Sequence, residues 1–134
     1  MVGQPSDKQK ALAEIELKTL ERALSLVKAG VSVTDFMAPV YYDYAEPMLK
    51  EAGIVDYNIQ GYVGHGTGVK VFESPVLWKQ SPMTLRPGMV IDMEPGIYAK
   101  DPAIGGMRTS EFIVVTETGY EVMFEYPRRT GSWG

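Results

Sequence analysis

The chain has 134 residues, of which 45% are hydrophobic and 22% are charged, and its formal net charge is −4 at pH 7. This composition is that of an ordinary globular domain and argues against disorder or fibrous repeats. The absence of cysteine excludes disulfides, thiolate metal sites and cysteine nucleophiles. An acidic balance without a basic run speaks against nucleic-acid binding, and no apolar run is long enough for a transmembrane helix. We therefore expect a single cytoplasmic domain over residues 1–134, with no membrane or nucleic-acid partner.

The first part of the chain has a helical pattern. Ser6 and Gln9 have the spacing of an N-terminal capping box. Apolar residues then recur every three to five positions, which predicts one buried helical stripe: Leu12, Ile15, Leu20, Leu24 and Val27. We predict a first helix from Asp7 to Ala29, with Gly30 as its C-terminal stop.

A second helix is predicted over residues 33–51, and Gly53 should end it. Pro39 is tolerable because it falls in the first turns. Pro47 lies in the interior, where it should kink or split the helix, because proline lacks the N–H that a helix interior uses.

From Ile54 onward, glycine and proline are frequent and the apolar runs are short, which is typical of strands and turns. Four runs are predicted to be strands: Val69–Phe72, Met89–Met93, Phe112–Thr116 and Glu121–Glu125. Residues 117–120 should form the hairpin turn between the last two strands, with Gly119 at a positive φ. Two helices followed by antiparallel strands predict an α+β architecture.

Three short segments carry residues that could do chemistry. His65, the single histidine, lies between glycines that leave its imidazole uncrowded. Glu94 follows an apolar strand, where a buried carboxylate is costly unless it is paired or bound to a metal. Arg108 follows two glycines and could pair with a carboxylate, and Glu111 opens the next strand. Each segment alone also has a plainer interpretation: a turn with a surface histidine, an exposed glutamate, and an ordinary surface ion pair.

The order and spacing of these residues favour one common site. His65, Glu94 and Glu111 lie 29 and then 17 residues apart, each at the edge of a predicted strand. A mixed set of imidazole and carboxylate ligands suits Mn, Co, Fe or Zn. We expect His65 and Glu94 to face each other across the concave side of the sheet.

Five sequence blocks resemble the prolidase, Xaa-Pro aminopeptidase and creatinase branch of the pita-bread metallopeptidases. The blocks are Gly64–Gly68, Leu85–Val90, Met93–Tyr98, Gly105–Arg108 and Val115–Gly119. The opening segment, Met1–Ser6, is similar to the end of the strand that carries the family's second aspartate ligand. The resemblance implies the C-terminal part of the pita-bread fold, with two helices packed on a curved antiparallel sheet. It also implies a divalent metal site with two ions in full-length members, where a bridging water attacks a peptide bond next to proline.

Three features depart from the family pattern. The two aspartate ligands would fall upstream of Met1, so we expect the C-terminal part of a catalytic domain whose N-terminal half is absent. Ser110 falls where the family has its final glutamate. Glu111 lies one place later, on the other face of a regular strand unless a bulge brings it back. Phe72 stands where a second histidine is usual.

The resemblance predicts a metal-dependent Xaa-Pro peptidase that takes a proline-containing peptide. It implies metal ligation by His65 and Glu94, and we predict catalytic roles for His65, Glu94 and Arg108. Glu111 is predicted as a further metal ligand, and whether Ser110 or Glu111 takes the place of the family's final glutamate stays open. The metal would be Mn, Co, Fe or Zn. We expect this chain alone to be inactive, because two cleanly transferred ligands are too few, and whether it binds any metal stays open.

Two alternatives to a peptidase remain. One is a creatinase-like hydrolase or a lyase on the same fold, with His65 as general base and with Glu94 and Arg108 holding a small charged substrate. The other is a catalytically dead binding domain. In each case the sheet edge that would meet the missing half is expected to drive self-association, as a homodimer or a domain-swapped assembly.

Overall fold

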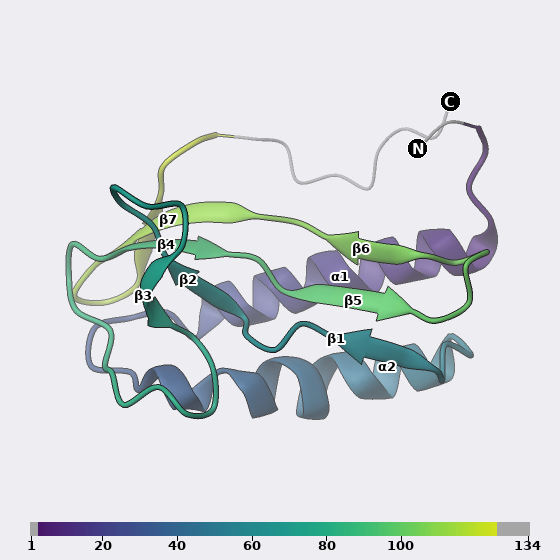
Figure 1. Ribbon diagram of the computed structural model, residues 1–134, viewed down its shortest axis with the longest axis horizontal. Coiled ribbons are helices and arrows are strands. Elements are labelled where there is room, and N and C mark those ends of the chain that lie inside the picture. Colours follow the sequence, from purple (N-terminus) through teal and green to yellow (C-terminus); the bar gives the residue numbers. More distant parts are fainter. Residues whose placement is uncertain (1–2, 126–134) are drawn as a thin grey trace.

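The computed structural model describes residues 3–125 as antiparallel sheets with the helices packed along one side (Figure 1). Helix α1 (Asp7–Ser25) begins with the predicted capping box, in which Ser6 and Gln9 satisfy each other's backbone N–H groups. The predicted apolar stripe is buried, with each member at most 6% exposed: Leu12, Ile15, Leu20, Leu24 and Val27. The segment Met1–Ser6 was predicted to correspond to the end of a strand of the family fold, and its residues 1–2 lie outside the described residues.

Helix α1 ends four residues earlier than predicted. The N–H of Ala29 donates to the carbonyl oxygen of Thr116, and the N–H of Gly30 donates to that of Leu85. These N–H groups bond to the sheet side of the molecule instead of continuing the helix. Gly30 has φ of +85°, but α1 ends at Ser25, so the predicted role of Gly30 as the C-terminal stop of the helix is wrong.

The predicted second helix is divided into three pieces: the 3₁₀ turn η1 (Val33–Asp35), the π-helix η2 (Ala38–Ala45) and the α-helix α2 (Glu46–Glu51). The N–H of Glu46 donates to the carbonyl oxygen of Tyr41, five residues back. The change of helix type comes directly before Pro47, which has no N–H to donate, so the expected split is confirmed. Gly53 follows α2 with φ of +68°.

Strands make up the rest of the described chain: β1 (Tyr57–Ile59), β2 (Gly64–Gly66), β3 (Glu73–Val76), β4 (Val90–Met93), β5 (Gly96–Ala99), β6 (Gly106–Arg108), β7 (Glu111–Val115) and β8 (Tyr120–Val122). They form a three-stranded sheet in the order β1-β5-β6 and a five-stranded sheet in the order β3-β2-β4-β7-β8. Each strand pair is antiparallel. The predicted α+β class is confirmed, and the last three predicted strands correspond to β4, β7 and a shorter β8.

Two local predictions are wrong. Residues 69–72 form an exposed loop instead of a strand, because short-range hydrogen bonds from Thr67 and Gly68 to that loop occupy backbone groups that a partner strand would need. Gly119 does not have a positive φ. The turn at Gly119 is instead closed by Thr116, whose hydroxyl accepts from the Gly119 N–H and whose own N–H donates to the Gly119 carbonyl.

The helices cover only one face of the strands. On β4, Ile91 and Met93 are fully buried in the core shared with the helices, and Ile113 of β7 lies beside them. Because side chains alternate along a strand, Asp92 and Glu94 point to the opposite face. Among the described residues, no helix combines the length and apolar character needed to cross a membrane.

Candidate metal site

The site lies where the two sheets meet. Residues 60–63 connect β1 to β2, residues 94–95 connect β4 to β5, and residues 109–110 connect β6 to β7, so each connection crosses from one sheet to the other. Figure 1 shows these paths side by side at the middle of the molecule. Hydrogen bonds join the first two: Glu94 N–H donates to the Val63 carbonyl, and Gln60 N–H donates to the Gly96 carbonyl.

His65 and Glu94 converge as the sequence predicted. His65 Nε2 lies 3.1 Å from Glu94 Oε1, and the two side chains are only 4% and 7% exposed. His65 Nδ1 lies 2.9 Å from the carbonyl oxygen of Gly66. A carbonyl oxygen can only accept, so this contact assigns the hydrogen to Nδ1 and directs Nε2 at the carboxylate. The lone pair of a neutral imidazole would then face a carboxylate oxygen, so the contact calls for a proton or a cation between them.

The glycines around His65 allow the backbones to approach closely. A Cβ at Gly64 would lie 2.6 Å from the carbonyl oxygen of Asp92, and a Cβ at Gly66 would collide with the carbonyl oxygen of Ser74. Glycine is therefore required on both sides of His65, because strand β2 fits tightly between β3 and β4.

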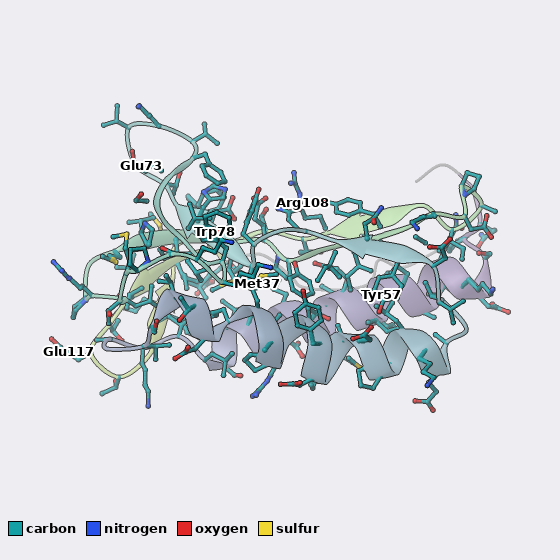
Figure 2. All side chains as sticks on the ribbon, turned by 60° about the horizontal axis from the view of Figure 1, so that its bottom comes forward. Met37, Tyr57, Glu73, Trp78, Arg108 and Glu117 are labelled. Carbon is teal, nitrogen blue, oxygen red and sulfur yellow. The ribbon has the colours of Figure 1, made fainter. Side chains whose placement is uncertain are left out.

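Both oxygens of Glu94 contact polar side chains, from the connection between β1 and β2 and from the end of β6. The Tyr62 hydroxyl donates to Oε1 at 2.9 Å, and Gln60 Nε2 donates to the same oxygen at 3.4 Å. Arg108 Nη1 lies 3.5 Å from Oε2. Figure 2 shows Arg108 on the side of the sheet away from the helices. Burial, together with the bond to the Glu94 carboxylate, raises the pKa of Tyr62 to about 12, so its hydroxyl stays a donor at neutral pH.

Asp92 is a site residue that sequence reasoning missed. One oxygen of Asp92 lies within 4.8 Å of a ligand atom of His65 and of Glu94, and the three residues are buried. Burial raises the pKa of Asp92, and the Glu94 charge raises it further, whereas His65, a hydrogen bond from Ser110 and Arg108 oppose the shift. Asp92 lies on the predicted strand Met89–Met93, two residues before Glu94, and this spacing was the signal that could have identified it.

Glu111 is not in this group of three, and its assignment as a metal ligand stays a prediction. In the register of β4 and β7, Glu111 pairs with Met93, and Asp92 pairs with Phe112. Directly paired residues share a face, so Glu111 lies on the face of Met93, opposite Asp92 and Glu94. The register of these two strands is regular over the four paired positions, so the bulge that would have brought Glu111 back is absent there.

Phe72 lies at the site despite its place in an exposed loop. Its ring centroid is 4.2 Å from that of His65 and 5.4 Å from that of Tyr62. The rim of the site is thus aromatic where the resemblance would have placed a second histidine. Figure 2 shows the loop that ends at Glu73 projecting from the sheet on the side away from the helices.

Two buried groups on the helix side hold the connections in place. The Tyr41 hydroxyl accepts from Gly96 N–H at 2.9 Å and donates to the Tyr62 carbonyl at 3.2 Å. It therefore joins the segment that follows Glu94 to the neighbouring connection between β1 and β2. Glu16 of α1 accepts from the backbone N–H and the hydroxyl of Thr109, at 2.9 and 2.6 Å. Burial raises the pKa of Glu16 from 4.5 to about 7 against the lowering effect of these two bonds. Both residues act on the backbone that carries the site.

The donor set fits a divalent cation. One imidazole nitrogen and two carboxylates, buried together, are the ligands that Mn, Co, Fe and Zn accept in proteins. Asp92 Oδ1 is buried and has no hydrogen-bond partner among the described residues. The Nδ1 contact with a backbone carbonyl is the arrangement that orients metal-binding histidines.

The antiparallel α+β fold brings a buried histidine and two buried carboxylates together where its two sheets meet. These are the side chains of a metal-binding protein. The chain matches the model of metallopeptidase family M24 over residues 1–117, and it belongs to that family.

Relatives and solved structures agree with this assignment. The chain is 35% identical over 119 residues to an Xaa-Pro dipeptidase of Pyrococcus furiosus, covering 89% of this chain and 32% of that protein. It superimposes on an X-Pro aminopeptidase from Thermotoga maritima with a TM-score of 0.79 and 32% identity, over 96% of this chain and 34% of that one. An Xaa-Pro dipeptidase from Bacillus anthracis gives 0.79 and 36%, with the same coverage. The pita-bread fold is confirmed, and the chain spans about a third of the length of the relatives it matches.

Proposed function

We propose that this chain contributes the histidine and glutamate part of a divalent-cation site in a metal-dependent peptidase that cleaves peptide bonds next to proline. The contact of His65 Nε2 with Glu94 Oε1, buried at the junction of the sheets, is the observation that carries the proposal. Membership in the M24 family and the similarity to Xaa-Pro dipeptidases support the reaction class.

His65 and Glu94 would hold the cation. When bound, a divalent cation of this kind supplies an activated water and stabilises the charge that develops on the peptide carbonyl. Arg108 is 48% exposed and lies 3.5 Å from Glu94, so it can hold the Glu94 carboxylate in place and offer its outer face to a substrate carboxylate. The aromatic rings of Tyr62 and Phe72 form an apolar wall suited to a proline ring.

Cation binding is the direct test. We expect isothermal titration of the chain with Mn²⁺ or Co²⁺ to show micromolar binding that disappears in His65→Ala and in Glu94→Gln. Glu117→Gln is the matched control, because Glu117 is exposed at a distant turn. Equal binding by wild type and His65→Ala would contradict the proposal.

The chain alone should not turn over an Xaa-Pro dipeptide, because it spans about a third of its relatives and carries only part of a dinuclear ligand set. Hydrolysis of such a dipeptide by the purified chain with added Mn²⁺ would overturn this expectation. Self-association through the sheet edges remains our prediction, and sedimentation that shows only a 14.8 kDa species would contradict it. The cytoplasmic location also stays a prediction.

A second candidate is favoured by two substitutions at the site. Phe72 and Ser110 replace residues that a peptidase of this family is expected to use, which suits a creatinase-like hydrolase or a lyase acting on a small charged substrate. His65 would then be a general base, with Glu94 and Arg108 binding the substrate. Titration of the chain with creatine in the presence of EDTA separates the two: binding that is lost in Arg108→Gln favours this candidate, and no heat of binding argues against it.

A further inference from the structure

Asp92 carries a buried carboxylate oxygen that nothing in the described protein satisfies. The residue is 7% exposed, and its Oδ1 has no hydrogen-bond partner among residues 3–125. Buried carboxylates are normally paired, hydrogen-bonded or bound to a metal, because loss of hydration without a partner is unfavourable. An oxygen left in this state therefore indicates a ligand that completes the site.

The position of Asp92 indicates what that ligand is. Its carboxylate shares a face with Glu94, and ligand atoms of Asp92, Glu94 and His65 all lie within 4.8 Å of one another. Two carboxylates this close repel each other unless positive charge lies between them. Arg108 is half-exposed and lies 3.5 Å from Glu94, so it neutralises the outer side of the pair.

Ser110 carries no charge, and it forms a side-chain hydrogen bond with Asp92. Asp92 Oδ1 is nevertheless left without a hydrogen-bond partner among the described residues. We propose that Asp92 is the third protein ligand of the divalent cation held by His65 and Glu94, and that it supplies the carboxylate which Ser110 cannot. This inference rests on the proposed function, because it concerns the same cation.

The rival arrangement has Glu111 as the third ligand. Glu111 pairs with Met93 across β4 and β7 and so lies on the opposite face from Asp92. For Glu111 to reach the cation, β7 would have to shift by one residue against β4, which would also move Ile113 out of the core.

The experiment is a titration of the chain with Mn²⁺ alone, repeated with Co²⁺ to record its visible absorption bands. We expect Asp92→Asn to lower the affinity for each cation by more than about 10-fold, because loss of a ligand costs at least as much affinity as loss of a group that orients a ligand. The Co²⁺ bands should shift in position as well as weaken. Glu111→Gln should bind as wild type does, and so should the control Glu117→Gln. If the Asp92→Asn variant does not fold, Asp92→Ser serves as the second variant.

Unfolding in EDTA gives a second readout that separates ligation from structural support. Removing a buried unsatisfied charge should raise the Tm of Asp92→Asn above that of wild type, whereas loss of a structural contact would lower it. A variant that is more stable without cation and binds cation poorly is the signature of a ligand.

The outcomes distinguish this inference from the proposed function. If His65→Ala abolishes binding but Asp92→Asn keeps it, the inference is overturned and the cation site stands. If Glu111→Gln loses binding and Asp92→Asn does not, the rival arrangement replaces it. If the unaltered chain binds neither cation, the inference and the proposed cation site fail together.

Discussion

Replacing Glu16 with glutamine should change how the stability of the chain depends on pH. Glu16 is 0% exposed, and its carboxylate accepts two hydrogen bonds from Thr109, the residue between Arg108 and Ser110. Glutamine has the same shape and can keep both bonds, because its oxygen accepts from the Thr109 N–H and its amide donates to the hydroxyl. What the substitution removes is the ionisation of a buried carboxyl.

The expected size follows from the pKa of Glu16. Burial raises it from 4.5 to about 7, so the folded chain holds a proton that the unfolded chain releases between these values. The contribution of protonated Glu16 to stability is therefore fully present below pH 4.5 and is lost as the pH rises through about 7. Each pKa unit is worth about 1.4 kcal/mol, which gives a loss of about 3 kcal/mol in wild type between pH 4 and pH 8. Glu16→Gln lacks this loss.

Urea unfolding followed by circular dichroism at pH 4, 6 and 8 checks this. The free energy of unfolding of Glu16→Gln, relative to wild type, should rise by about 3 kcal/mol from pH 4 to pH 8. Other titrating groups cancel in the comparison. Glu14→Gln is the control on the same helix, where the side chain is exposed, and it should show no such trend. A relative change below about 1 kcal/mol, or one of opposite sign, would show that the pKa of Glu16 is not raised in the folded chain.

Three further substitutions test the support of the site. Tyr62→Phe removes the hydrogen bond from the Tyr62 hydroxyl to Glu94 and should weaken Mn²⁺ binding by about 10-fold in a titration. Tyr57→Phe is the control, because its hydroxyl bonds to Glu46 and should not affect Mn²⁺ binding. Equal affinities of the two variants would show that the Tyr62 hydroxyl does not orient Glu94. Gly66→Ala forces a Cβ onto the backbone of β3 and should destabilise the chain by about 1–3 kcal/mol in urea unfolding. Gly61→Ala is the control, because a Cβ at Gly61 meets open space. Equal unfolding midpoints for the two variants would count against tight packing at Gly66. Tyr41→Phe leaves the buried N–H of Gly96 without its acceptor and should lower the free energy of unfolding by about 1–3 kcal/mol. An unchanged denaturation midpoint would show that this hydrogen bond does not stabilise the fold.

The helical half of the fold could be predicted because its signals are local. The capping box at Ser6 and the apolar stripe of α1 depend on residues three or four positions apart, which a helix brings together by its own geometry. Pro47 likewise announced the division of the second helix, because its missing N–H acts wherever the residue lies. The loop at 69–72 shows the opposite case: its alternating valines satisfy a strand pattern, but no neighbouring strand pairs with them in the described structure.

The site divides in the same way. The pairing of His65 with Glu94 could be predicted, because their glycine and proline neighbours form recognisable sequence blocks. The structure places their side chains 3.1 Å apart. That Asp92 lies beside them, whereas Glu111 lies on the opposite face of the sheet, could be seen only in the folded chain. This difference depends on the register of β4 against β7, and a shift of one residue would exchange the two faces. Register is set by the packing of the whole sheet on its helices, which no short stretch of sequence contains.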